Sequence, residues 1–139
     1  MSEGFIADSS VGVAWAVPSQ ASDATDDLLD NVATGTPLVV PTLWSFEVAN
    51  SLLVLLRRKR ILALERDRAL GALAQLPLVV DDEGPRLALG RISELANEHG
   101  LSVYDATYLE LAVRRKLPLA SRDGALCKAA QDCRVKLLL

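Results

Sequence analysis

Short apolar segments that alternate with helical patterns are the feature that most constrains how this chain folds. Apolar segments of three or four residues predict strands at 5–7, 38–40, 78–80, 117–120 and 135–138. Helical spacing and helix start or stop residues predict helices at about 11–17, 22–33, 43–58, 64–76, 85–99, 102–116 and 124–132. Strands that alternate with helices and are apolar throughout are typical of an α/β fold with a parallel sheet covered on both faces.

Composition excludes several classes of function. The 139 residues fit one domain, 1–139, and half of them are hydrophobic, which is enough for a buried core. A net charge of −3 gives no general attraction to nucleic acid, and 4% aromatic residues exclude a base-stacking platform. His99 is the only histidine in the sequence, so an acid–base pair of histidines is excluded.

Two further features concern the location of the protein. Cys127 and Cys133 lack the spacing of a metal site and are too few for a disulfide framework, which favours reduced thiols. No signal peptide is visible, and the most apolar run, 43–56, contains Glu47 and Asn50 and is too short for a membrane span. We therefore expect a cytoplasmic protein.

Acidic residues stand where an α/β sheet binds ligands, just beyond the carboxyl ends of its strands. Asp8 follows the first predicted strand and Asp123 the fourth, while Asp105 lies in the first turn of the helix at 102–116. For any one of these aspartates alone a helix cap is the favoured interpretation, and Ser102 and Asp105 have the spacing of a capping box.

Glu47 has no such explanation, because it lies inside the most apolar helix of the chain. An ionised carboxylate in that setting needs a partner or a metal ion, and Asn50, three residues on, could hold it. The alternative is a solvent-facing glutamate on a thin polar stripe with Asn50 and Ser51.

Together the four carboxylates predict a metal site. Asp8, Asp105 and Asp123 can converge at one edge of the sheet with Glu47 nearby, and such crowded carboxylates repel one another unless a cation neutralises them. Mg²⁺ and Mn²⁺ prefer oxygen ligands of this kind. One or two such ions suit the attack of water on a phosphodiester, a reaction that requires no histidine or cysteine.

At these residues the sequence resembles the PIN-domain ribonucleases, specifically the VapC-type toxins of bacterial toxin–antitoxin pairs. The likeness rests on four ordered segments, 5–11, 40–52, 101–112 and 117–123, and covers essentially the whole chain. It implies a PIN-like three-layer α/β/α sandwich with a five-stranded parallel sheet. It also implies Mg²⁺- or Mn²⁺-dependent cleavage of a structured RNA such as tRNA or rRNA, a homodimer and a VapB-like antitoxin.

The resemblance also implies a role for individual residues. The acidic quartet of the family falls on Asp8, Glu47, Asp105 and Asp123, of which the three aspartates would contact the metal. Supporting positions fall on Ser9, Asn50 and Ser121, and the last of these is more often threonine in the family. Glu47 would act directly or through water.

Other interpretations remain open on the sequence alone. A PIN-like fold without activity could bind RNA or protein, and Asp81 or Asp82 could be the phosphoacceptor of a receiver domain. A dehalogenase-type phosphatase needs a second aspartate where Ser10 stands. The residues Arg57, Arg58, Arg60 and Arg122 could bind RNA phosphates, although a solvated helix end explains most of that basic run. The apolar stretch 52–56 predicts a helix covered on every side, which favours a dimer.

Overall fold

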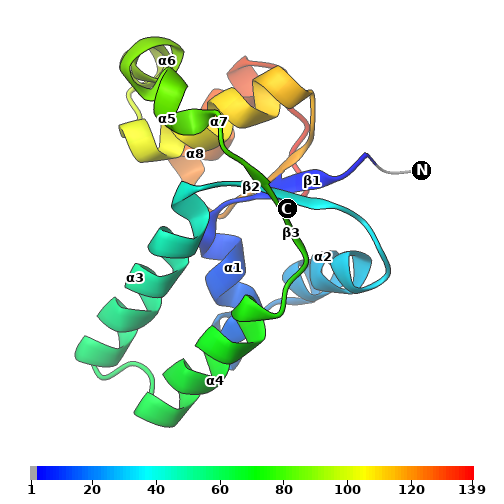
Figure 1. Ribbon diagram of the computed structural model, residues 1–139, viewed down its shortest axis with the longest axis vertical. Coiled ribbons are helices and arrows are strands. Elements are labelled where there is room, and N and C mark those ends of the chain that lie inside the picture. The colour runs from blue at the N-terminus through cyan, green and yellow to red at the C-terminus, as the bar shows by residue number, and fades with distance from the viewer. Residues whose placement is uncertain (1–2) are drawn as a thin grey trace.

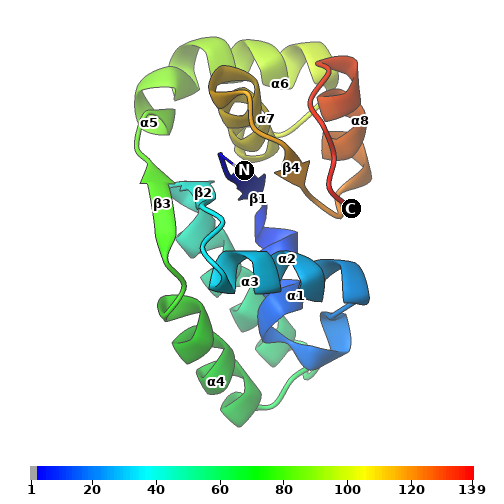
Figure 2. The same ribbon diagram turned by 90° about the vertical axis from the view of Figure 1, so that its right-hand side faces the viewer.

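The chain forms a parallel sheet between two layers of helices, as the computed structural model of residues 3–139 shows (Figure 1, Figure 2). The strands are β1 (Phe5–Ala7), β2 (Leu38–Pro41), β3 (Leu78–Asp81) and β4 (Leu119–Ala120). They are all parallel in the order β3-β2-β1-β4, and Ile6 pairs with Val39 on one side and Leu119 on the other. The α/β class with a parallel sheet is therefore confirmed.

Helices lie on both faces of this sheet. One layer contains α1 (Ser9–Ala16), η1 (Pro18–Gln20), α2 (Asp23–Ala33), α3 (Leu43–Arg57) and α4 (Ala63–Ala74). The other contains α5 (Gly84–Leu87), η2 (Ala88–Ile92), α6 (Ser93–His99), α7 (Val103–Arg115) and α8 (Gly124–Asp132). The two central strands are fully buried between these layers, as their uninterrupted apolar sequences require. No described helix is both long and apolar enough to cross a membrane.

The sheet has four strands among the described residues, so the prediction of five strands is wrong. The segment predicted at 135–138 makes only an isolated parallel bridge, between Leu119 and Leu137, within the described residues. It keeps two backbone hydrogen bonds there, from Leu119 N to the Lys136 carbonyl at 2.9 Å and from Leu138 N to the Leu119 carbonyl at 3.0 Å. Because β4 is two residues long, it offers too few backbone groups for a longer ladder.

Two other segments differ from their predictions. The helix expected at 85–99 is broken into α5, η2 and α6, because Gly90 adopts non-helical angles (φ −125°, ψ −105°) that its missing Cβ permits. The edge strand β3 is not covered on both faces, since Val79 and Val80 are exposed. An apolar run therefore marks an edge strand here as well as the buried ones.

A network of charged side chains fastens α7 to the edge strand β3. The guanidinium of Arg114 donates to both carboxylate oxygens of buried Asp81, at 2.9 and 3.0 Å, and also to Glu110 at 2.7 Å. Arg115 adds a third bond to Asp81, at 2.9 Å. The hydrogen bonds from Arg114 are the main reason that the pKa of Asp81 falls to about 2. Asp81 is thus a structural anion covered by two arginines, which argues against a phosphoacceptor role.

Helix α1 packs closely against α3 at a glycine. A Cβ added to Gly12 would lie 2.7 Å from the Trp44 ring and 3.0 Å from the Val48 side chain, so only glycine fits without movement. The indole nitrogen of Trp44 donates to the backbone carbonyl of Asp8 at 3.2 Å. This hydrogen bond fixes the position of the first turn of α3 relative to the carboxyl end of β1.

Replacing this glycine tests the close approach. Gly12→Ala should lower the free energy of unfolding by about 1–3 kcal/mol, the usual cost of overpacking, although alanine favours helices. Gly71→Ala in α4 is the matched control, because nothing lies within 4 Å of the added Cβ. That control should stabilise the protein by up to about 1 kcal/mol. Urea unfolding measures both values, and equal stabilisation by the two variants would contradict the packing described here.

Candidate active site

Asp8 is held rigidly at the carboxyl end of β1. Its Oδ1 accepts from the backbone N–H groups of Ser10 and Val11, at 3.1 and 3.4 Å, and thereby caps α1. The same oxygen accepts from the Ser10 hydroxyl, and Oδ2 accepts from the Ser121 hydroxyl. The helix-cap interpretation is thus correct, and the buried carboxylate is also fixed in one orientation.

Two serines tie the loop after β4 to the start of α1. Ser121, which is buried, donates to Asp8 and accepts from the backbone N–H of Asp123 at 3.0 Å. Ser10 donates to Asp8 and accepts from the backbone N–H of Arg122 at 3.1 Å. Asp123 in turn caps α8 by accepting from Leu126 N at 2.9 Å. The first and fourth strands therefore present their aspartates at one edge of the sheet.

Asp105 comes to the same edge from the opposite layer of helices. It lies in the first turn of α7, where the Ser102 hydroxyl accepts its backbone N–H at 3.0 Å. This is one half of the predicted capping box, because no described bond joins the Asp105 carboxylate to the Ser102 backbone. The carboxylate of Asp105 is half-buried, and a side-chain hydrogen bond with Ser102 partly offsets the rise that burial causes in its pKa.

Glu47 is held by a residue that the sequence analysis missed. Its Oε1 accepts from the hydroxyl of Tyr108 at 2.6 Å, across the gap between α3 and α7. Tyr108 is only 1% exposed, and it lies three residues after Asp105 on the same face of α7. That spacing from a candidate site residue was the available signal. Glu47 is half-buried, so it does not belong to a solvent-facing polar stripe. Asn50 is exposed and forms no hydrogen bond with Glu47 among the described residues.

Burial, and then mutual repulsion, raises the pKa values in this group of carboxylates. Burial is the main reason that the pKa values of Asp8, Glu47 and Asp105 are all raised above their ordinary values. The negative charges of Asp123 and Asp8 raise the pKa of Asp105 further, and those of Asp105 and Asp8 do the same for Glu47. The predicted quartet is therefore one electrostatically coupled cluster.

The donor chemistry of this cluster suits a hard divalent cation. All four side chains offer carboxylate oxygens, and a cation would relieve the repulsion among them. Among residues 3–139, however, no three acidic, histidine or cysteine side chains stand close enough together to hold an ion in the structure as it is. Asp8, Asp105 and Asp123 are the groups that would hold an ion, and Glu47 stands beside them with one oxygen engaged by Tyr108.

The other predicted site residues lie outside the cluster of four carboxylates. Ser9 has no side-chain hydrogen bond in the described part of the chain, so its supporting role stays a prediction, and Ser10 is the neighbouring residue that bonds to Asp8. Arg57 is the last residue of α3, and Arg58 and Arg60 follow it. They are ten residues or more beyond Glu47, which is roughly 15 Å along a helix. Their contact with RNA stays a prediction, as does that of Arg122, which borders the cluster.

Neutralising one carboxylate tests the repulsion. In metal-free protein at neutral pH, Glu47→Gln should raise the midpoint of thermal unfolding, because the amide still accepts from Tyr108 without carrying a charge. The folded-state pKa of Glu47 is raised, so the parent should lose stability relative to this variant as the pH rises through that pKa. Asp67→Asn, at an exposed site on α4, is the control and should change little.

The same measurement with Mn²⁺ tests the metal site. An ion that binds only the folded protein should raise the midpoint of the parent, and Asp105→Asn should lose most of that rise. An equal rise in Asp105→Asn and the parent would contradict the assignment of Asp105 as a metal ligand.

Comparison with known proteins agrees with this fold. The family model described as the PIN domain matches residues 5–132. The structure of PAE2754 from Pyrobaculum aerophilum superposes with a TM-score of 0.68 at 22% identity, covering 93% of this chain and 87% of that one. FitAcB from Neisseria gonorrhoeae gives 0.61 at 19% identity, covering 97% and 96%. No curated protein sequence matches significantly. The family model spans nearly the whole chain, and the chain therefore belongs to the PIN-domain family.

Proposed function

We propose that this protein is a metal-dependent endoribonuclease, a VapC-like toxin that hydrolyses phosphodiester bonds in a structured RNA such as tRNA or rRNA. The observation that carries the proposal is the coupled cluster of Asp8, Glu47, Asp105 and Asp123 at the carboxyl edge of a PIN-domain sheet. The all-oxygen donor set favours Mg²⁺ or Mn²⁺ as the cofactor.

Each side chain has a distinct part in the proposed reaction. When bound, the ion would balance the charge of the phosphodiester and lower the pKa of the attacking water. Asp8 is held in place by Ser10 and Ser121, so it offers fixed oxygens to the ion. Glu47, with its raised pKa, takes up a proton from the attacking water, either directly or through a second water molecule.

Tyr108 is a positioning residue in this scheme. Burial is the main cause that raises its pKa above the ordinary value, so at neutral pH it keeps its proton and donates to Glu47. The bond occupies Oε1, and no described residue donates to Oε2, which is left to accept the proton. Because the tyrosine is buried in the core, it restricts Glu47 to one side of the cluster.

The partners of the protein follow from the same proposal. A nuclease that attacks cellular RNA needs an inhibitor, and the resemblance to VapC toxins points to a VapB-like antitoxin. An RNA substrate and two unpaired cysteines favour a cytoplasmic location.

Cleavage of RNA by purified protein, free of antitoxin, tests the activity. Incubation of total RNA with Mg²⁺ or Mn²⁺ should give discrete fragments, and excess chelator should abolish them. Asp8→Asn and Asp105→Asn should reduce the rate by about 100-fold or more, since even residues outside the metal's ligand set cost 10–100-fold. Asp67→Asn is the control and should cleave as the parent does. Equal cleavage by the parent and both site variants would make the site assignment wrong.

A PIN-like module without activity is the second candidate. The observation that favours it is that, among the described residues, the carboxylates are not close enough together to hold an ion. Calorimetry separates the two, because a module without activity would bind neither Mg²⁺ nor Mn²⁺.

We also propose a homodimer, although not through the stretch 52–56. Leu52 is buried in the chain's own core, and the next four residues are half-buried. A more open apolar surface surrounds Phe46 and Tyr104, whose side chains are 76% and 61% exposed. Together with Pro85 they border a groove of about 280 Å³ with a mostly apolar lining. An exposed apolar patch of this kind is typical of a protein–protein interface.

Sedimentation tests the dimer. The parent should sediment at twice the mass of one chain, and Phe46→Glu should sediment as a monomer, because a charge cannot be buried there without a partner. Leu62→Glu is the matched control, since Leu62 is 71% exposed in the loop before α4 and lies outside this groove. A parent that stays monomeric over a wide concentration range would refute the proposal.

A further inference from the structure

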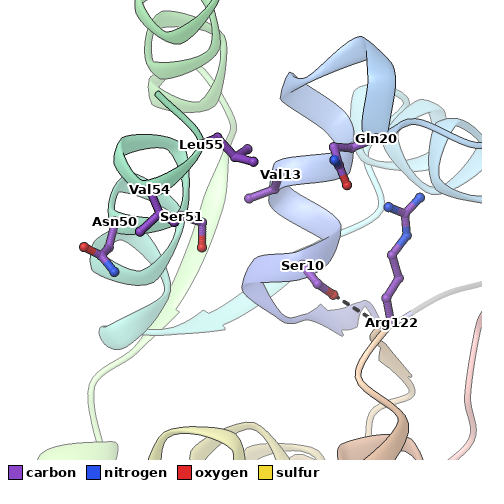
Figure 3. A pocket seen from close by; sticks show the side chains of 8 residues that line it. All are labelled: Ser10, Val13, Gln20, Asn50, Ser51, Val54, Leu55 and Arg122. Carbon is purple, nitrogen blue, oxygen red and sulfur yellow. Dashed lines mark hydrogen bonds between the residues drawn. The ribbon is translucent and has the colours of Figure 1, made fainter. Parts of the chain in front are cut away.

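A groove of about 470 Å³ opens between α1 and α3 beside the acidic cluster (Figure 3). Ser10 joins the two sites, because its side chain lines the groove while its hydroxyl donates to Asp8. The backbone N–H of Arg122 donates to the same Ser10 oxygen at 3.1 Å, so the loop after β4 closes one end of the groove. Whatever occupies this groove therefore lies next to the proposed reaction centre.

The walls of the groove are apolar. Val13 projects from α1, and Val54 and Leu55 project from α3, with Leu55 drawn facing Val13 across the gap (Figure 3). Side chains on two facing helices can enclose a flat group between them. The volume falls within the range of pockets that hold small ligands, roughly 300–1,000 Å³.

The rim of the groove carries polar groups that can recognise a ligand. Gln20 and Asn50 have amides that both donate and accept, and Ser51 points into the space between the helices (Figure 3). No hydrogen bond engages these three side chains within residues 3–139. They are therefore available to a ligand.

Arg122 adds a positive charge to this rim. Its guanidinium has one weak contact, with the Ser22 hydroxyl at 3.5 Å, and no ion pair to it is found in the described chain. No acidic side chain lines the groove either. A guanidinium in this situation is suited to bind a phosphate.

We propose that this groove binds the nucleotide next to the bond that is cut, with its base extruded from the RNA. The base lies against the apolar surface around Leu55 and Val54, its polar edge meets the Ser51 hydroxyl or the Gln20 amide, and a phosphate meets Arg122. Enzymes that act on extruded nucleotides recognise them in this way, with apolar contacts to the base face and hydrogen bonds to its edge. The inference rests on the proposed nuclease function and gives it a base preference.

Filling the groove tests the proposal by kinetics. Ser51→Phe places a ring between the two walls and should raise KM by about 10-fold or more with less effect on kcat, as expected when substrate binding alone is lost. It should also weaken the base preference at mapped cleavage sites, and the Mn²⁺-induced rise in unfolding midpoint should stay as in the parent. Ser45→Phe is the matched control, since it adds the same bulk to an exposed site of α3 outside this groove.

A binding measurement tests the groove without cleavage. The four nucleoside 5′-monophosphates are titrated to millimolar concentration while the methyl resonances of Val13, Val54 and Leu55 are followed by NMR. At least one nucleotide should shift them, and Gln20→Ala should weaken that binding. Gln20 is exposed, so this variant keeps the test valid if Ser51→Phe does not fold. Gln75→Ala, at the exposed end of α4, is its control.

The outcomes separate the groove from the nuclease activity. One outcome would overturn the groove assignment and leave the nuclease intact. In it, RNA cleavage depends on Asp105, but Ser51→Phe keeps the parent's KM and no nucleotide shifts the methyl resonances. Nucleotide shifts without any cleavage would show that the groove binds nucleotides but would overturn the nuclease and, with it, the position of the groove beside a cut bond. If only a purified antitoxin segment shifts the methyls, the groove is a protein-docking surface and the proposal is wrong.

Discussion

The close packing of α1 against α3 is the contact on which the geometry of the acidic cluster depends. Gly12 leaves room for the Trp44 ring, and the indole N–H of Trp44 reaches the backbone carbonyl of Asp8. This bond fixes the start of α3 relative to the end of β1. Glu47 follows Trp44 by three residues, so it lies on the same side of the helix and faces the cluster. The same two helices also line the groove, α1 through Val13 and α3 through Leu55.

Helix α7 depends on a second set of contacts, which lies away from the cluster. Arg114 and Arg115 clamp its C-terminal end to Asp81 of the edge strand, and its first turn presents Asp105. The pKa of Asp81 is depressed to about 2, so its stabilising ion pairs persist above its unfolded pKa and are lost only as the pH falls toward 2. Asp81 is buried while the arginines are partly exposed, so removing either arginine would leave a buried carboxylate with fewer partners and destabilise the protein. Charged residues at the two ends of α7 thus serve different purposes, because the ion pairs at its C-terminal end hold the helix to β3 and Asp105 at its start joins the acidic cluster.

Local patterns predicted the parts of this structure that local chemistry determines. The alternation of apolar strands with helices predicted the sheet, and Asp8 and Asp123 stand at helix starts because a carboxylate there caps free N–H groups. Contacts between distant segments were not predictable in this way. The bond from Tyr108 to Glu47 spans 61 positions, and the contacts of Ser10 depend on where the β4–α8 loop passes. The break at Gly90 and the reduction of the fifth strand to a bridge depend on packing that a residue pattern does not encode.

The four carboxylates differ in how the fold supports their charge. Asp8 and Asp123 cap α1 and α8, and Asp105 lies in the first turn of α7, so each aspartate stands at the positive end of a helix dipole. Glu47 lies inside α3, away from its N-terminal end, and depends on a single hydroxyl. The partial positive charge of a helix N-terminus favours a negatively charged group beside it. Glu47 is the one member of the cluster without such a helix end, which is why we propose it as the group that takes up the proton.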